Sequence, residues 1–326
     1  MKNDKNLLTR RNLLVQASVG AVGASLASQG RAGAIAKSSH PANGPDLFRI
    51  RALDRKYDCH RPNGCTLLAI EVAGWPGNEF GLWIPEVIFA RLQPEPDPVN
   101  KVFWANWTNQ PSGVHQDFEQ DASGRWIWKH TLEQFVVTTT LTPDPARRCL
   151  WYRHSFRNTS SETLYSLDSQ TCFHMVNAPQ FISLQGSRIW ANLDGQWMTT
   201  DKVPRDQSPD PRRVSFLRRG LRTERTVVPS KGMPSAHMPE AAHHPLIIAE
   251  SFSGDASVGI ASRDFEKLSN NNDSILRCLH SEPAPIKKLD PGETAHQDAV
   301  IIFFNGDHRA IVEHYTSRIA PNWPPN

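Results

Sequence analysis

The chain has 326 residues, of which 39% are hydrophobic and 21% charged, and its formal charge at pH 7 is +3. This length can bury a sizeable core as one large domain or two smaller ones, and 25 prolines and 10 tryptophans favour one large β unit. No stretch after the first 34 residues is long and apolar enough to span a bilayer, which excludes an integral membrane segment after processing.

The N-terminus has the order of an export signal. A charged start leads into Thr9-Arg10-Arg11-Asn12-Leu13-Leu14, a mildly apolar run covers 13–27, and Ala32-Gly33-Ala34 provides small residues for cleavage. This order resembles a twin-arginine signal peptide, which implies a periplasmic or secreted protein. An uncleaved anchor is the alternative, but a membrane-spanning helix needs about 20 apolar residues and this run is shorter. We therefore expect residues 1–34 to be a twin-arginine signal peptide.

The positive charge belongs to this signal. Removal of residues 1–34 takes away five basic side chains and one acidic one, which turns the formal charge of +3 into −1. Net charge then gives no argument for nucleic-acid binding, so we expect no nucleic-acid partner.

Period-two alternation of apolar residues dominates the rest of the chain. It predicts a strand over 126–132 with a continuation over 135–141, and further strands over 149–158 and 165–175. Ser253-Gly254-Asp255 predicts the turn of a hairpin between the strands that flank it.

The C-terminal segment predicts a turn, a strand and a helix. Leu289-Asp290-Pro291-Gly292-Glu293 has proline and glycine placed for a tight turn, and 299–304 is a short apolar strand. Asp307 is a candidate N-cap, followed by apolar residues at four-residue spacing: Ile311, Tyr315 and Ile319.

These elements predict an all-β fold, a large antiparallel β-sandwich with one C-terminal helix. We expect a disordered tether over 35–44 and a single β-sandwich domain over 45–326. Residues 201–225 differ in composition, with eight basic and four acidic residues and three prolines. We expect a solvated basic excursion there; the alternative is a positively charged wall for an anionic ligand such as an acidic or sulfated sugar.

Two predicted turns resemble those of a known protein family. Arg157-Asn158-Thr159-Ser160 lies between two predicted strands, and the turn at Pro291 leads to a final strand that ends in Asn305-Gly306-Asp307. Both resemble segments of galactose-mutarotase-like supersandwich proteins, a fold used by aldose epimerases, polysaccharide lyases and glycoside-processing enzymes. The resemblance implies a supersandwich that binds a carbohydrate or glycan. The epimerases use a histidine as acid and a glutamate as base, but no matching glutamate motif is found here, so the reaction does not follow.

The most suggestive chemical pattern is a repeated Cys-x-His, at Cys172-Phe173-His174 and Cys278-Leu279-His280. On a strand, each unit presents a thiol and an imidazole on one face. Three interpretations stay open: buried structural cysteines with hydrogen-bonded histidines, a catalytic histidine pair, or a site for zinc or copper.

A carboxylate accompanies the second unit. Glu282 follows His280 by two residues, and an imidazole and a carboxylate in one cleft can divide acid and base roles. The candidate catalytic residues are therefore His174, His280 and Glu282, with both histidines opening into one pocket and Glu282 at its rim. No residue is assigned to a resident metal, and the pattern identifies no cofactor.

Aromatic residues in polar segments are candidate sugar-binding residues, because flat rings suit the apolar faces of sugars and nearby amides suit their hydroxyls. A core position is the alternative for each tryptophan. A histidine pair in 235–245, which its two prolines predict to be a loop, adds a further candidate. The substrate-binding candidates are Trp104, Trp107, Trp190, Trp197, His243 and His244.

The five cysteines are an odd number, so at least one is unpaired, and Cys59 and Cys65 are close enough in sequence for a small disulfide loop. No phosphate loop, dinucleotide fingerprint or nucleophile elbow occurs. We expect an exported carbohydrate-recognising protein that acts as an epimerase-, lyase- or hydrolase-like enzyme. The alternative is a non-catalytic carbohydrate-binding or structural envelope protein.

Overall fold

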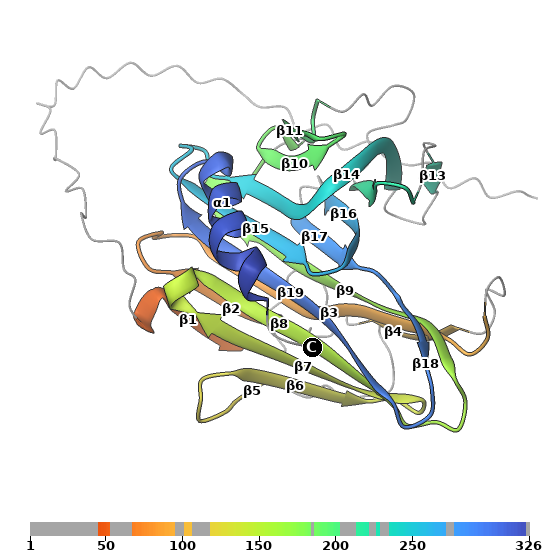
Figure 1. Ribbon diagram of the computed structural model, residues 1–326. Helices are drawn as coiled ribbons and strands as arrows, with labels where there is room; N and C mark the ends of the chain where they lie inside the picture. Colours follow the sequence, from red (N-terminus) through yellow and green to blue (C-terminus); the bar gives the residue numbers. More distant parts are fainter. Residues whose placement is uncertain are drawn as a thin grey trace, which may run out of the picture. The chain divides into compact units, whose positions relative to one another are not determined.

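The computed structural model describes residues 45–52, 67–94, 101–105, 118–183, 186–202, 213–221, 226–228, 235–271 and 277–323 (Figure 1). All of them belong to one compact unit, residues 40–326. The expected signal peptide and tether, the Cys59–Cys65 disulfide and Trp107 lie outside the described residues. In the described part of the chain, no helix has the length and apolarity needed to cross a membrane.

Nineteen strands make up most of the described chain, and short helical turns follow some of them. The strands before residue 178 are β1 (Phe48–Ala52), β2 (Leu67–Val72), β3 (Glu79–Arg91), β4 (Lys101–Ala105), β5 (Glu119–Gln120), β6 (Trp126–Thr131), β7 (Phe135–Asp144), β8 (Cys149–Asn158) and β9 (Leu164–Asn177). The later strands are β10 (Ile189–Leu193), β11 (Gln196–Thr199), β12 (Arg213–Arg218), β13 (Thr226–Val228), β14 (Ser235–Glu250), β15 (Ala256–Ser262), β16 (Phe265–Asn271), β17 (Cys278–Pro283), β18 (Ile286–Leu289) and β19 (Thr294–Asn305).

The strands form two packed layers, which are continuous through hydrogen bonds. In the first layer β2, β3, β9, β17, β16 and β12 are neighbours, and in the second β6, β7, β8, β19, β15 and β14 are neighbours. The long strand β14 joins the layers, because its first half pairs in parallel with β12 and its second half pairs antiparallel with β15. The expected large β-sandwich is confirmed, and β12–β14 is a parallel pairing within it.

Aromatic side chains fill the space between the layers. Phe303 of β19 packs against Phe80 of β3 and Phe173 of β9, with ring centroids 5.4 and 5.9 Å apart. All three rings are fully buried in the main hydrophobic cluster, which draws apolar residues from both layers. Every second residue of these strands points into this core, as the alternation predicts.

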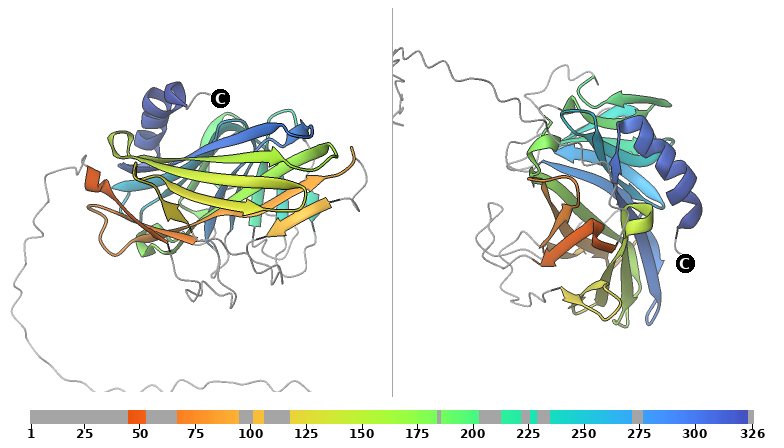
Figure 2. Two further views of the ribbon diagram at one scale, coloured as in Figure 1. Left: turned by 90° about the horizontal axis from the view of Figure 1, so that it is seen from below. Right: turned by 90° about the vertical axis from the view of Figure 1, so that its left-hand side faces the viewer.

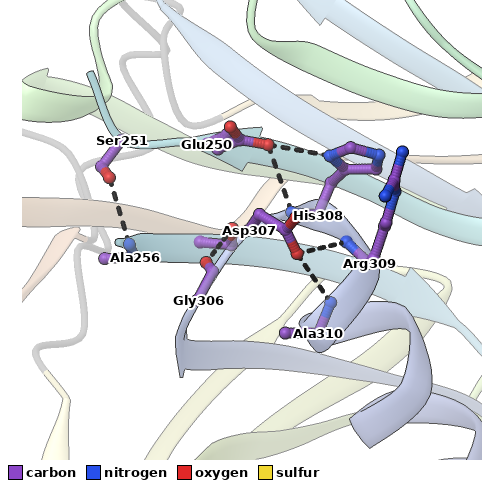
Figure 3. A network of polar contacts seen from close by, with 9 residues as sticks. Glu250, Ser251, Ala256, Gly306, Asp307, His308, Arg309 and Ala310 are labelled. Carbon is purple, nitrogen blue, oxygen red and sulfur yellow. Dashed lines mark hydrogen bonds and ion pairs between the residues drawn. The ribbon is translucent and has the colours of Figure 1, made fainter. Parts of the chain in front are cut away.

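The C-terminal helix covers the outer face of the second layer (Figure 2). Helix α1 (His308–His314) continues into a π-helical turn, and Ile311, Tyr315 and Ile319 are buried against that face. The Asp307 carboxylate accepts hydrogen bonds from the backbone N–H groups of Arg309 and Ala310 (Figure 3). The predicted N-cap and apolar spacing are therefore confirmed.

Two other sequence predictions differ from the structure. The segments 126–132 and 135–141 form the hairpin of β6 and β7, in which Leu132 donates its N–H to the carbonyl oxygen of Phe135, and are not one continued strand. Residues 235–245 belong to strand β14 and do not form a loop. The register of β14 with β12 shifts between Phe216 and Arg218, and Pro239 lies opposite this irregularity, where a missing N–H costs least.

Part of the expected basic excursion is also a strand. Val214 and Phe216 of β12 are buried in the main cluster, and β12 pairs with β14 and β16. Apolar side chains at alternate positions place 213–218 inside the sandwich despite the surrounding charge. Residues 203–212 and 222–225 lie outside the described residues.

Candidate functional site

Strands β9, β17 and β16 are neighbours in the first layer (Figure 1), and their outer face carries polar side chains. Leu167, Phe173, Leu268 and Leu279 point into the main cluster, so the residues that alternate with them point outward. We call this outward surface the β9–β17 face. Its polar members are Asp168, Gln170, His174, Lys267, Ser269, His280 and Glu282.

Glu282 is the buried charge at the centre of the β9–β17 face. Its side chain forms an ion pair with Lys267, with Nζ 2.5 Å from Oε2, and it accepts a hydrogen bond from the Ser269 hydroxyl at 3.3 Å. Glu282 is only 6% exposed. The Lys267 ammonium compensates the charge that burial would otherwise disfavour, and the place of Glu282 at the rim of a pocket stays a prediction.

Asp168 is the second carboxyl group of this face. Its Oδ1 atom is buried and has no hydrogen-bond partner among the described residues. Burial and then the charge of Glu282 raise the pKa of Asp168 to about 8, against the opposing effects of Lys267 and the Ser169 N–H. Asp168 is therefore a protonated acid at neutral pH, and the charge that acts on it most strongly is that of Glu282, the ion-pair partner of Lys267.

Hydrogen-bonding groups continue the face toward β3. The Gln170 amide donates to Glu86 Oε2 at 2.6 Å, and Glu86 is 8% exposed. A ligand hydroxyl could replace either group as the hydrogen-bond partner of the other, because an amide and a carboxylate together supply donors and acceptors.

The two Cys-x-His units lie on neighbouring strands, as expected. Cys278 is paired directly with His174 in the β9–β17 ladder. Cys172 and Cys278 form a disulfide with Cα atoms 5.9 Å apart, and both histidines are buried, His174 to 3% and His280 to 1% exposure. In this disulfide-bonded state Cys172 and Cys278 are buried structural cysteines, which agrees with the first of the three interpretations.

The histidines differ in their contacts. His280 Nδ1 is 3.0 Å from the carbonyl oxygen of Thr171. The His174 ring packs beside Trp83 with centroids 5.6 Å apart, and burial lowers its pKa to about 4. Neither ring nitrogen of His174 has a hydrogen-bond partner among the described residues.

Metal-ligand atoms converge at the same place. One ligand atom each from Cys172, Cys278 and His280 lie within 4.8 Å of one another, and all three residues are buried. In the disulfide state the two sulfur atoms are bonded to each other, so they cannot act as thiolate ligands.

The predicted aromatic ligands lie elsewhere. Trp190 and Trp197 line a cleft of about 400 Å³ beside α1, on the outer face of the second layer. Trp190 stacks on His308 with ring centroids 3.5 Å apart, and His244 contacts both Trp197 and Tyr315. This cleft and the β9–β17 face are on opposite outer faces of the sandwich.

The remaining binding candidates are scattered. His243 is exposed on β14, and Trp104 is on β4, where its side chain is not described. The structure thus places His280 and Glu282 on one face of β17 and His174 on β9 opposite Cys278, and brings Trp190, Trp197 and His244 together at a second place.

Sequence reasoning missed Asp168 and Lys267. The signal for Asp168 was present, because counting back in steps of two from His174 along β9 gives Cys172, Gln170 and Asp168 on one face. Lys267 offers no such signal, since only the pairing of β16 with β17 places it opposite Glu282.

Comparisons with known proteins find fold similarity only among solved structures. No protein family model and no characterised protein sequence matches the chain. Similar structures include the Slr1438 protein from Synechocystis sp. PCC 6803, with 10% identity, a TM-score of 0.43 and coverage of 79% of this chain and 92% of that one. A galactose mutarotase related enzyme from Lactobacillus acidophilus has 10% identity, a TM-score of 0.42 and coverage of 81% and 97%.

A GalM/aldose epimerase homologue from C. elegans has 9% identity, a TM-score of 0.38 and coverage of 80% of this chain and 99% of that one. These identities and TM-scores are too low to assign the chain to a family. Two of the three are described as relatives of the epimerases whose fold the turns at Asn158 and Pro291 resemble.

Proposed function

We propose that the protein is a carbohydrate-active enzyme that uses Asp168 as acid and Glu282 as base on the β9–β17 face. The observation that supports this is the proximity of two carboxyl groups whose surroundings favour opposite protonation states. Such a pair divides acid and base roles at one pH. His280, two residues from Glu282 on the same face, is the third candidate for contact with the substrate.

The proposed chemistry balances for a cyclic sugar. Glu282 accepts the proton of the anomeric hydroxyl while Asp168 gives its proton to the ring oxygen. The bond between the anomeric carbon and the ring oxygen breaks, and the anomeric hydroxyl becomes a carbonyl. Ring closure on the other face of that carbonyl returns both protons and restores both groups. An epimerase-, lyase- or hydrolase-like reaction would use the same two groups, and Gln170, Glu86 and Ser269 supply hydrogen bonds that suit sugar hydroxyls.

The experiment is a substrate panel with matched variants. Full-length protein is tested on free aldoses by polarimetry, on aryl glycosides and on uronate-containing polysaccharides. We expect Asp168→Asn and Glu282→Gln each to lower turnover by about 100-fold or more, whereas the exposed Glu133→Gln leaves it unchanged. Full activity in either site variant would refute the assignment.

A non-catalytic carbohydrate-binding protein is the second candidate, favoured by the cleft of Trp190 and Trp197. One binding titration with the same sugars distinguishes the two functions. Binding that is weakened by Trp197→Ala, unaffected by Asp168→Asn and accompanied by no turnover would support the binding protein.

We also propose export through the twin-arginine route, on the order of residues at the N-terminus. Arg10→Lys with Arg11→Lys should retain the precursor in the cytoplasm, and N-terminal sequencing of exported protein should find a start between Gly33 and Lys37. Normal export of the double variant would remove this assignment.

A further inference from the structure

The β9–β17 face carries a ligand set that the proposed acid–base pair does not use. Cys172, His174, Cys278 and His280 occupy alternate positions on two hydrogen-bonded strands, so all four side chains rise from the same small patch. Donor atoms of Cys172, Cys278 and His280 are already within 4.8 Å of one another. Two thiolates and two imidazoles are the ligand set of tetrahedral zinc sites.

His280 has the tautomer that a zinc ligand needs. A carbonyl oxygen can only accept a hydrogen bond, so His280 Nδ1 carries the proton and donates to Thr171, and Nε2 is the unprotonated nitrogen. His174 lies outside the cluster of converging atoms, because its Nε2 atom lies over Gly81 of β3. Neither nitrogen of this buried imidazole has a hydrogen-bond partner among the described residues, so the ring is expected to gain stability from one.

We propose that the reduced form of this chain binds one zinc ion through Cys172, Cys278 and His280, with His174 turning away from Gly81 to become the fourth ligand. A dithiol reductant supplies two electrons and two protons, the Sγ–Sγ bond breaks, two thiols form, and the reductant becomes a disulfide. The thiols then release their two protons to solvent as the divalent ion binds. The Cys172–Cys278 disulfide and the zinc site are thus alternative states of one cluster, and this inference does not depend on the proposed enzymatic activity.

The test uses the full-length chain with Cys59→Ser and Cys65→Ser, so that no thiol from outside the described residues contributes. The protein is reduced with a dithiol, freed of it without oxygen, and titrated with Co²⁺, whose thiolate charge-transfer band reports sulfur ligands. We expect one ion per reduced chain, about two protons released per ion, and no binding by the oxidised chain. Zinc should displace the cobalt.

Matched variants separate this site from other thiols. Cys149 is also buried but lies in the cluster under α1, so Cys149→Ser should leave the cobalt band unchanged, whereas Cys172→Ser should abolish it. His280→Gln and His174→Ala keep both thiols and the disulfide, and each should raise the cobalt dissociation constant by roughly tenfold or more. These two variants decide the question even if Cys172→Ser fails to fold.

A disulfide that stays closed under the dithiol, or a reduced chain that binds no cobalt, would overturn the proposal. Unchanged affinity in His280→Gln would overturn it as well. Unchanged affinity in His174→Ala would remove His174 as the fourth ligand.

Discussion

Lys267 and Glu282 lie directly opposite each other on strands β16 and β17, and their charged groups meet at 2.5 Å. The side chains are 23% and 7% exposed, so water screens this pair little. The ammonium lets a carboxylate remain charged inside the sheet, and that charge in turn favours the protonated form of Asp168. Burial and then the charge of Glu282 thus favour the protonated form of Asp168, the proposed acid.

Removal of Lys267 should therefore destabilise the fold. Lys267→Met leaves the Glu282 charge buried without its counterion, and we expect the free energy of unfolding to fall by about 3 kcal/mol. Urea denaturation measures this, and adding Glu282→Gln to the variant should recover part of the loss.

The control for this prediction is a surface pair. Lys288 and Asp290 also meet at 2.6 Å, but their side chains are 57% and 39% exposed. Lys288→Met should lower the free energy of unfolding far less than Lys267→Met does, because water screens the exposed pair. Equal costs for the two lysine variants would contradict the role assigned to the buried pair.

Asp168 should make stability depend on pH. Its pKa is about 8 in the folded chain and near its ordinary value of 3.8 when unfolded, and the charged groups that act on it are Glu282, Lys267 and Glu266. Between pH 4 and 8 the folded state binds more protons, so the free energy of unfolding falls as pH rises, by up to about 1.4 kcal/mol per pH unit.

Asp168→Asn cannot ionise and should lack this contribution. The stability difference between variant and native chain should be smallest near pH 4, grow in favour of the variant up to about pH 8, and stay constant above it. Turnover by the native protein should also decline above about pH 8 as the acid loses its proton. Parallel stability profiles for the two chains would show that Asp168 has an ordinary pKa.

Local patterns predicted much of the fold. Alternation gave strand β8 with its observed limits, 149–158, and four-residue spacing after Asp307 gave the C-terminal helix with its N-cap. The prolines of 235–245 indicated a loop, but neighbours on both sides of β14 stabilise an extended chain there. Propensity is a weak guide when pairing partners come from distant segments.

The sequence predicted only those features of the site that follow from the alternation of side chains along a single strand. Steps of two residues placed His280 and Glu282 on one face, and the same step along β9, which was not taken, leads from His174 to Asp168. The position of Lys267 and the Cys172–Cys278 disulfide depend on strand register, which spacing within one segment does not reveal.

A glycine at position 81 should be required for the observed position of the His174 ring. A Cβ atom at Gly81 would lie 1.8 Å from His174 Nε2, so Gly81→Ala forces the imidazole out of its place. We expect the free energy of unfolding to fall by about 1 to 3 kcal/mol. In a His174→Ala background the same glycine change should cost much less, because the clash is gone. A cost that is independent of residue 174 would mean that the backbone, not the imidazole, limits position 81.

Asn158 should join the two turns that carry the family resemblance. Its side chain is fully buried, and its amide group donates to the carbonyl oxygens of Glu162 at 2.8 Å and Leu289 at 2.9 Å. Its side-chain oxygen Oδ1 accepts a hydrogen bond from the Ser160 N–H at 3.0 Å. Asn158→Ala leaves these groups without partners, and we expect the free energy of unfolding to fall by about 3 kcal/mol.

Asn158→Asp tests whether the amide donor is the important part. A carboxylate keeps the bond from Ser160 but faces the Glu162 and Leu289 carbonyl oxygens without a proton, so we expect it to be at least as destabilising as alanine. Asn322→Ala is the control, since that exposed amide donates to a single helical carbonyl and its loss should cost less than about 0.5 kcal/mol. If urea denaturation gives all three variants the same stability, the link between the turns at Asn158 and Pro291 does not hold the layers in place.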